Sequence, residues 1–400
     1  MKKVAFVIQR YGLEVNGGAE LHCRQLAEKL TETYRVEVLT TKATDYMTWE
    51  EVYDCDQEEI GGVTVRRFSV NFPRNVQKFN QLSQKVLQMH SDRQEEEEWM
   101  RQQGPYSEKL LDYLKEHVTE YDVVIFFTYL YCTTYLGLPL AQDRAILIPT
   151  AHDELPIYLS IFKDMFLLPK GIFYNTALEK RFVEGRFHNG HILNNQGMGG
   201  VGVDLPGDIN ADRFQRKYGL DNYILYIGRI EEHKGCKDLF RYFREYKKRN
   251  PGSLKLVLMG KEVMGVPKDP DIISLGFVED QEKFDGLAGC RFLVLPSQFE
   301  SLSMVVLEAM AVEKPVLVHG NCEVVKEHCL ISNGGLYYQN YFEFEGCVNY
   351  LLGQEDICRR MGENGRRYVA EYYAWDAIVG RLSAMIEEVA AMPKDKMIER

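Results

Sequence analysis

Residues 223–240 have the sequence YILYIGRIEEHKGCKDLF. The apolar run at 223–228 has the length of a buried strand, and a helical pattern near 236–250 follows it after a polar loop. The alternation continues through the apolar runs KLVLMG (255–260), IISLG (272–276), RFLVLPS (291–297) and PVLVHG (315–320). Alternating strands and helices are typical of parallel sheets with crossover helices, so this segment is predicted to be an α/β domain.

The amino-terminal half shows the same alternation. Its apolar runs are VAFVI (4–8), RVEVLTT (35–41), VTVRRFSV (63–70), VVIFF (123–127), AILIPT (145–150), GIFYN (171–175) and HILNN (191–195). The helical i, i+3, i+4, i+7 spacing of Cys23, Leu26, Ala27 and Leu30 predicts a first βαβ unit at 1–41. The Gly-, Pro- and Asp-rich segment 197–208 is predicted to be a linker between two Rossmann-like domains, 1–197 and 198–375.

Segment 74–120 is predicted to be a helical excursion from the first domain. It contains the acidic run EEEE at 95–98, which is typical of a solvated helix face.

The composition is that of an ordinary globular protein. The 400 residues carry a net charge of −11, and this acidic balance argues against a nucleic acid as partner. Nine scattered cysteines without a C-x-x-C pair indicate reduced packing residues of a cytoplasmic protein. The most apolar segment, Val123 to Cys132, is about half of the ~20 residues that a transmembrane helix needs. No transmembrane segment is predicted, and peripheral membrane contact stays open.

Several motifs are absent or poorly placed. P-loop, zincin and hydrolase-elbow patterns do not occur. Gly197, Gly199 and Gly202 fit G-x-G-x-x-G, but no amphipathic helix follows them, which leaves an NAD-dependent dehydrogenase as a weak rival. Two D-x-D matches, Asp54 with Asp56 and Asp269 with Asp271, are expected to be solvated turns rather than metal ligands.

Two loops could bind phosphate. Gly17 and Gly18 lie between the first strand and the first helix, where backbone N–H groups favour oxyanions, although a flexible turn is equally compatible. Gly228 is followed by Arg229 and Lys234 at the carboxyl end of a strand, where open α/β sheets bind ligands. These two cations could bind a diphosphate or could be an ordinary surface pair.

The most informative segment is PSQFESLSMVVLEAM at 296–310. Glu300 lies in the loop before a helix and Glu308 about two turns into it, at most ~12 Å apart along the helix at ~1.5 Å per residue. A nucleotide sugar has hydroxyl-rich groups at both ends and a diphosphate between them, which suits two carboxylates and a helix amino terminus. His152 and Asp153 follow another strand and fit either a capping turn or a catalytic site.

These motifs together resemble the retaining GT-B-fold glycosyltransferases of family 4, the glycosyl transferases group 1. The resemblance is clearest over 220–340 and includes Gly17 and Gly18 with Glu20, the His-Asp pair at 152–153 and the GVGVD that precedes the second domain. It implies two domains that face each other across a cleft, the acceptor on the first and the donor on the second. It also implies that helix 376–400 returns to the first domain.

The resemblance also implies roles for individual residues. Glu300 would contact the donor sugar, Glu308 the ribose, Arg229 and Lys234 the diphosphate, and His152 the sugar. The remaining donor-binding positions would be Gly17, Gly18, Gly228, Phe277, Val278, Ser301, Leu302 and Ser303. Two features depart from the family: the chain has Val312-Glu313-Lys314-Pro315 where a glycine is usual shortly before the proline, and 74–120 matches no general family motif.

The resulting expectation is a retaining, metal-independent, hexosyltransferase-type enzyme that needs no cofactor. It would move a sugar from a nucleoside-diphosphate sugar to a hydroxyl of a saccharide, lipid-linked or other small acceptor, in glycan or polysaccharide biosynthesis. A non-catalytic nucleotide-sugar-binding subunit is the alternative from another functional class.

Overall fold

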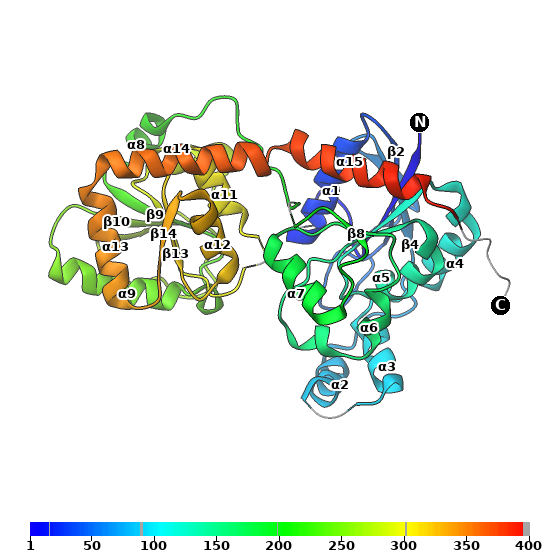
Figure 1. The fold of residues 1–400 in the computed structure, drawn as a ribbon. Coiled ribbons are helices and arrows are strands. Elements are labelled where there is room, and N and C mark those ends of the chain that lie inside the picture. Colours follow the sequence, from blue (N-terminus) through cyan, green and yellow to red (C-terminus); the bar gives the residue numbers. More distant parts are fainter. Residues whose placement is uncertain (16, 89–90, 198, 301, 395–400) are drawn as a thin grey trace. The chain divides into compact units, whose positions relative to one another are not determined.

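The computed structural model describes residues 1–15, 17–88, 91–197, 199–300 and 302–394 (Figure 1). The chain divides into two compact units: unit 1 is Met1–Gly200 with Ile378–Arg400, and unit 2 is Val201–Ala377. The boundaries expected from the sequence, 197/198 and 375/376, lie within three residues of these limits.

The sheet of unit 1 has the strand order β3-β4-β2-β1-β5-β6-β7-β8 in the described part of the chain. Its strands are β1 (Lys3–Val7), β2 (Arg35–Thr41), β3 (Gln57–Ile60), β4 (Val63–Phe68), β5 (Val123–Phe127), β6 (Ala145–Ile148), β7 (Gly171–Ile172) and β8 (Leu193–Asn194). Every pair is parallel except β3 with β4, which is antiparallel. This antiparallel edge pair has no signal in the sequence, because QEEI contains no apolar run that would reveal a strand.

In the described residues up to Gly200, unit 1 contains seven α-helices. They are α1 (Gly18–Leu30), α2 (Val76–Gln88), α3 (Arg93–Gln103), α4 (Glu108–His117), α5 (Cys132–Gly137), α6 (Ile161–Met165) and α7 (Ala177–Phe187), with 3₁₀ turns η1 (Val118–Glu120), η2 (Leu138–Arg144) and η3 (Leu155–Tyr158). Cys23, Leu26, Ala27 and Leu30 of α1 are fully buried, which confirms the predicted first βαβ unit.

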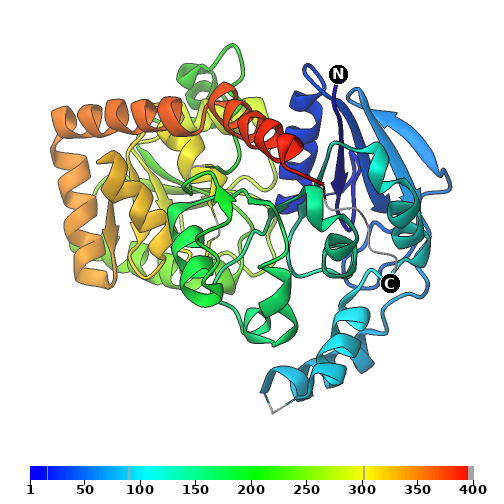
Figure 2. The same ribbon diagram turned by 45° about the vertical axis from the view of Figure 1, so that its right-hand side comes forward.

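The predicted helical excursion consists of α2, α3, α4 and η1. Helices α2 and α3 project from the rest of unit 1 in both views (Figures 1 and 2). The acidic run is not wholly solvated, because Glu96 is buried and accepts hydrogen bonds from the Ser160 hydroxyl at 2.6 Å and the Ile161 N–H at 3.1 Å. That prediction is therefore wrong for Glu96, which fixes the start of α6.

Unit 2 contains a second sheet with the order β11-β10-β9-β12-β13-β14, and all its described pairs are parallel. The strands are β9 (Tyr223–Ile227), β10 (Lys255–Met259), β11 (Ile272–Ser274), β12 (Leu293–Leu295), β13 (Val316–His319) and β14 (Gly335–Tyr338). The helices are α8 (Ala211–Tyr218), α9 (Cys236–Arg249), α10 (Asp280–Gly289), α11 (Met304–Ala311), α12 (Glu323–Ser332), α13 (Tyr341–Gly353) and α14 (Glu355–Tyr372), with the 3₁₀ turn η4 (Glu232–Lys234). The predicted α/β class with two Rossmann-like units is confirmed.

Helix α15 (Trp375–Ala391) begins in unit 2, and its residues from Ile378 onward belong to unit 1. There Glu387 accepts a hydrogen bond of 3.1 Å from the Tyr34 hydroxyl.

All nine cysteines are free thiols. Cys55 is exposed, although the cysteines were expected to be packing residues. Among the residues described, no helix combines the length and apolarity needed to cross a membrane.

Candidate functional site

The strand order of unit 2 creates a switch point between β9 and β12. From β9 the chain adds β10 and β11 on one side and then returns to add β12 on the other. The loops at the carboxyl ends of β9 and β12 therefore lie side by side, which is where open α/β sheets bind ligands. The contact is close: a Cβ at Gly235 would lie 2.4 Å from the Pro296 carbonyl oxygen, and Gly235 has φ +76°.

An ion pair connects these two loops. Lys234 Nζ lies 2.8 Å from Glu300 Oε1, and the two side chains are 28% and 13% exposed. The structure thus brings together two residues predicted to contact the same donor, 66 positions apart in the sequence. An ammonium group and a carboxylate in one half-buried place can bind a phosphate oxygen and a sugar hydroxyl, respectively.

Ser303 precedes α11 in a strained conformation, with φ +63°. Its hydroxyl oxygen is buried and has no hydrogen-bond partner within the part of the chain that is described. An unsatisfied buried hydroxyl beside the first N–H groups of a helix suits an oxyanion ligand. Leu302 is buried next to it, whereas Ser301, also predicted to bind the donor, lies outside the described residues.

Glu308 lies on α11 and is held by a lysine of another helix. Lys283 Nζ, on α10, lies 2.9 Å from Glu308 Oε1, and both side chains are largely buried. Burial alone would lower the pKa of Lys283, but the Glu308 and Asp280 carboxylates raise it, so the ammonium form is favoured. Sequence reasoning missed Lys283, because a single lysine in the acidic segment EDQEKFD belongs to no motif.

The other predicted donor residues of unit 2 lie on neighbouring loops. Arg229 is 63% exposed and its guanidinium pairs with Glu231 at 3.1 Å. Gly228 follows β9 with φ +149°. Phe277 is 81% exposed and Val278 half-buried, after β11. Of the two cations predicted to bind the diphosphate, Lys234 therefore pairs with Glu300 of the other loop, whereas Arg229 pairs with the nearby Glu231.

The glycine loop of unit 1 lies at the corresponding switch point, after β1. Gly17 caps α1 and Gly18 begins it. Glu20 is buried beneath this loop, where Arg10 Nε and Gln9 Nε2 each donate to Glu20 Oε1 at 3.0 Å. Glu20 therefore fixes the loop rather than offering a charge to solvent.

His152 follows β6 in unit 1 and its side chain is 54% exposed. Its Nε2 lies 3.5 Å from Glu154 Oε2. The backbone before it is fixed by Glu179, which accepts hydrogen bonds of 2.6 Å from the N–H groups of Ala151 and Asn175. Burial raises the pKa of Glu179 to about 7, although the backbone N–H donors lower it. No sequence motif identifies Glu179, because its two backbone partners follow the ends of different strands, β6 and β7.

Both D-x-D matches have carboxylates with cationic partners. Asp56 pairs with Lys42 at 2.7 Å. Asp269 pairs with Arg244 at 3.2 Å, and Asp271 pairs with Lys247 and Lys255. Each motif directly precedes a strand, β3 or β11, and so lies at the amino end of that strand.

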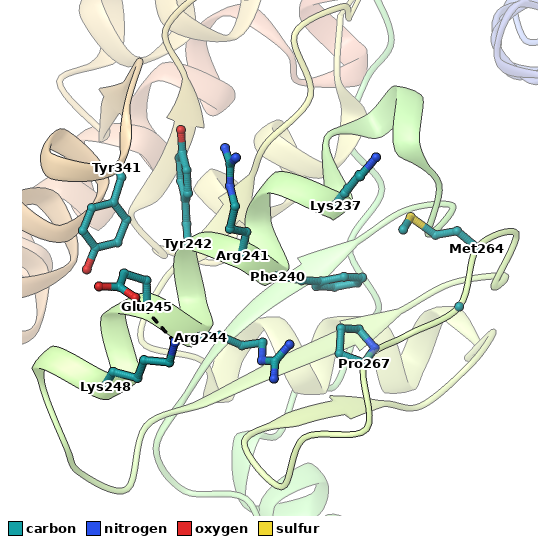
Figure 3. Close-up of a pocket in the computed structure, with 11 residues that line it drawn as sticks. Lys237, Phe240, Arg241, Tyr242, Arg244, Glu245, Lys248, Met264, Pro267 and Tyr341 are labelled. Carbon is teal, nitrogen blue, oxygen red and sulfur yellow. Dashed lines mark ion pairs between the residues drawn. The ribbon is translucent and has the colours of Figure 1, made fainter.

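A cavity of about 740 Å³ lies along α9, beside Tyr341 and Pro267 (Figure 3). Its lining cations each have a carboxylate partner, in the pairs Lys237–Glu232, Arg241–Asp238, Arg244–Asp269 and Lys248–Glu245. The cavity is lined by none of the predicted site residues, so the Lys234–Glu300 loops are the better candidate.

Part of the chain is similar to the glycosyl transferases group 1 family. The model of that family matches residues 208–368, which include all the unit 2 site residues named above. The alpha-D-kanosaminyltransferase of Streptomyces kanamyceticus is 27% identical over 205 residues, 46% of this chain and 51% of the relative. The putative glycosyltransferase EpsD of Bacillus subtilis is 27% identical over 193 residues, 43% of this chain and 49% of the relative. The chain thus spans about half the length of the curated relatives it matches.

Solved structures match nearly the whole chain in fold. Sucrose-phosphate synthase from Thermosynechococcus elongatus has a TM-score of 0.70 at 15% identity, covering 98% of this chain and 100% of its own. Anabaena HepE, solved in complex with UDP and glucose, has a TM-score of 0.66 at 14% identity, covering 97% and 100%. The fold is therefore that of the GT-B glycosyltransferases.

Proposed function

We propose that this chain is a retaining glycosyltransferase that moves a sugar from a nucleoside-diphosphate sugar to an acceptor hydroxyl without a metal ion. The observation that carries the proposal is the Lys234–Glu300 pair at the switch point of unit 2, together with the buried Ser303 hydroxyl, which has no hydrogen-bond partner among the described residues. The family match over 208–368 and the GT-B fold support it.

The proposed mechanism starts from donor binding. Lys234, the Ser303 hydroxyl and the first N–H groups of α11 would bind the diphosphate, with Arg229 turning from Glu231 to join them. Glu300 would accept a hydrogen bond from a sugar hydroxyl, and Glu308, oriented by Lys283, would accept from the ribose. The predicted role of His152, contact with the donor sugar, stays a prediction.

In the transfer step, the bond from the anomeric carbon to the leaving phosphate oxygen breaks and its electron pair stays on that oxygen. The acceptor hydroxyl forms the new bond on the same face and gives its proton to the departing phosphate, so the anomeric configuration is kept. Negative charge grows on the diphosphate, and Lys234, Ser303 and α11 would stabilise it more in the transition state than in the ground state.

A thermal-shift panel of UDP, GDP, ADP and dTDP sugars, followed by release of the nucleoside diphosphate with saccharide and lipid-linked acceptors, tests this proposal. A ligand at 100 times its dissociation constant adds about 2.7 kcal/mol of stability. Stabilisation with turnover is expected. No stabilisation by any donor would contradict the proposal, and binding without turnover would favour the nucleotide-sugar-binding subunit.

The dehydrogenase rival loses its support, because its glycines have packing roles. A Cβ at Gly199 would lie 2.1 Å from the Tyr174 carbonyl oxygen, and one at Gly202 would lie 2.3 Å from the Trp375 ring. The next helix, α8, begins only at Ala211. The acceptor class, peripheral membrane contact and the cytoplasmic location stay predictions.

A further inference from the structure

A buried histidine lies behind the loop that contains Glu300. His328, on α12, is in contact with two other elements. Its Nε2 lies 3.0 Å from the Leu302 carbonyl oxygen, and its Nδ1 lies 2.9 Å from the hydroxyl of Tyr368 on α14. His328 belongs to no motif singled out in the sequence.

The two partners determine which ring nitrogen carries the proton. A carbonyl oxygen only accepts, so Nε2 must donate its hydrogen to Leu302. In a neutral ring Nδ1 then accepts, and the Tyr368 hydroxyl donates to it. Burial lowers the pKa of His328 to about 4, although the hydrogen bond to the Leu302 carbonyl raises it. The ring is therefore neutral at ordinary pH.

The Leu302 carbonyl lies at a point where the backbone needs support. Leu302 follows Glu300 by two positions and directly precedes Ser303, whose φ of +63° is unfavourable for a residue other than glycine. Lys234 pairs with the Glu300 side chain, and His328 of α12 forms a hydrogen bond with the Leu302 carbonyl. A strained segment persists only when its surroundings fix it.

We propose that His328 is a positioning residue for sugar transfer, because its hydrogen bond fixes the Leu302 carbonyl, directly before Ser303 and two positions after Glu300. This inference rests on the proposed function of the same loop. The effect should fall on the transition state more than on binding, since the groups that meet the growing charge need accurate placement.

The test compares two variants at this position with one at its neighbour. His328→Phe removes both hydrogen bonds but keeps a planar ring, and His328→Gln keeps an N–H that can reach Leu302. Cys329→Ala perturbs the next buried side chain of α12, whose Sγ lies 3.8 Å from the Leu336 carbonyl oxygen. The probes are the nucleotide sugar selected by the panel and its nucleoside diphosphate.

We expect His328→Phe to lower kcat by roughly 100-fold, the cost typical of about 1 Å misplacement, with the affinity for nucleoside diphosphate changed less than about threefold. His328→Gln should regain at least about fivefold of that loss, and Cys329→Ala should keep kcat within about threefold of wild type. The proposal is overturned by a small effect of His328→Phe, by equal losses in the Phe and Gln variants, or by a loss that Cys329→Ala shares.

A measurement without substrate separates this proposal from the proposed function. The ¹⁵N NMR shifts of the His328 ring should show the proton on Nε2, and Tyr368→Phe should shift the Nδ1 resonance. A proton on Nδ1 would overturn the role of His328 even in an active enzyme. Failure of every nucleotide sugar to bind would refute the proposed function while the ring assignment still stood.

Discussion

Replacing Lys283 by methionine removes the ammonium group that lies 2.9 Å from Glu308 and keeps an unbranched side chain in its place. The two side chains are only 17% and 15% exposed, so water screens their interaction weakly. A hydrogen bond between charged groups in such a place contributes roughly 1.5–3 kcal/mol. We expect urea unfolding to show a loss of that size. Because Glu308 also loses its orientation, the dissociation constant of the nucleoside diphosphate should rise about tenfold or more in calorimetry.

A matched control and a double variant make this prediction refutable. Lys237 makes a pair of similar length with Glu232, at 2.8 Å, but the two side chains are 68% and 67% exposed, so Lys237→Met should change neither stability nor affinity measurably. Lys283→Met combined with Glu308→Gln should bind no more weakly than Glu308→Gln alone, since the residue that Lys283 orients is already changed. Fully additive losses, or a Lys237→Met effect as large as that of Lys283→Met, would refute the reasoning.

Three further predictions concern the turn at Glu313, the buried Glu179 and metal dependence. Glu313→Gly should raise stability by on the order of 0.5 kcal/mol in calorimetry. Relief of a left-handed residue, ~1–2 kcal/mol, exceeds the entropy cost of glycine, ~0.5–1 kcal/mol. A lower melting temperature would contradict this prediction. Since burial raises the pKa of Glu179 from 4.5 to about 7, its stabilising contribution is fully present below pH 4.5 and lost as pH rises through 7. Wild type should therefore lose more stability between pH 5 and 8 than Glu179→Gln does, and equal slopes would count against this. Transfer should survive excess EDTA, because Lys234, Ser303 and α11 can meet the diphosphate charge and the D-x-D carboxylates have cationic partners; loss of activity that manganese restores would show otherwise.

The elements that sequence reasoning predicted well are those with local patterns. The strand, glycine loop and helix at 223–249 follow from local spacing, and Glu300 precedes α11 as predicted. Glu308 lies about one turn into α11 rather than about two, because the helix begins only at Met304. Strand β3 was not predicted because its sequence is polar. The burial of Glu96 was not predicted because it depends on the packing of α6. The segment 312–315, which departs from the resembled family, contains the left-handed residue Glu313, with φ +59°.

The partners of the site residues could not be predicted, because they come from distant segments without motifs. Lys283 reaches Glu308 across 25 positions, and His328 reaches Leu302 across 26. Pairing Lys234 with Glu300 likewise depends on the strand order that brings β9 beside β12. The sequence identifies the groups that suit a nucleotide sugar, whereas the residues that hold them in place emerge only from the fold.

The most direct test of the central claim is an NMR time course of sugar transfer by the wild type and by Glu300→Gln, with the donor and acceptor found by the panel. The account predicts that the first product has the anomeric configuration of the donor, and that Glu300→Gln forms little product although it still binds the nucleoside diphosphate. An inverted anomer as first product, or wild-type transfer by Glu300→Gln, would contradict it.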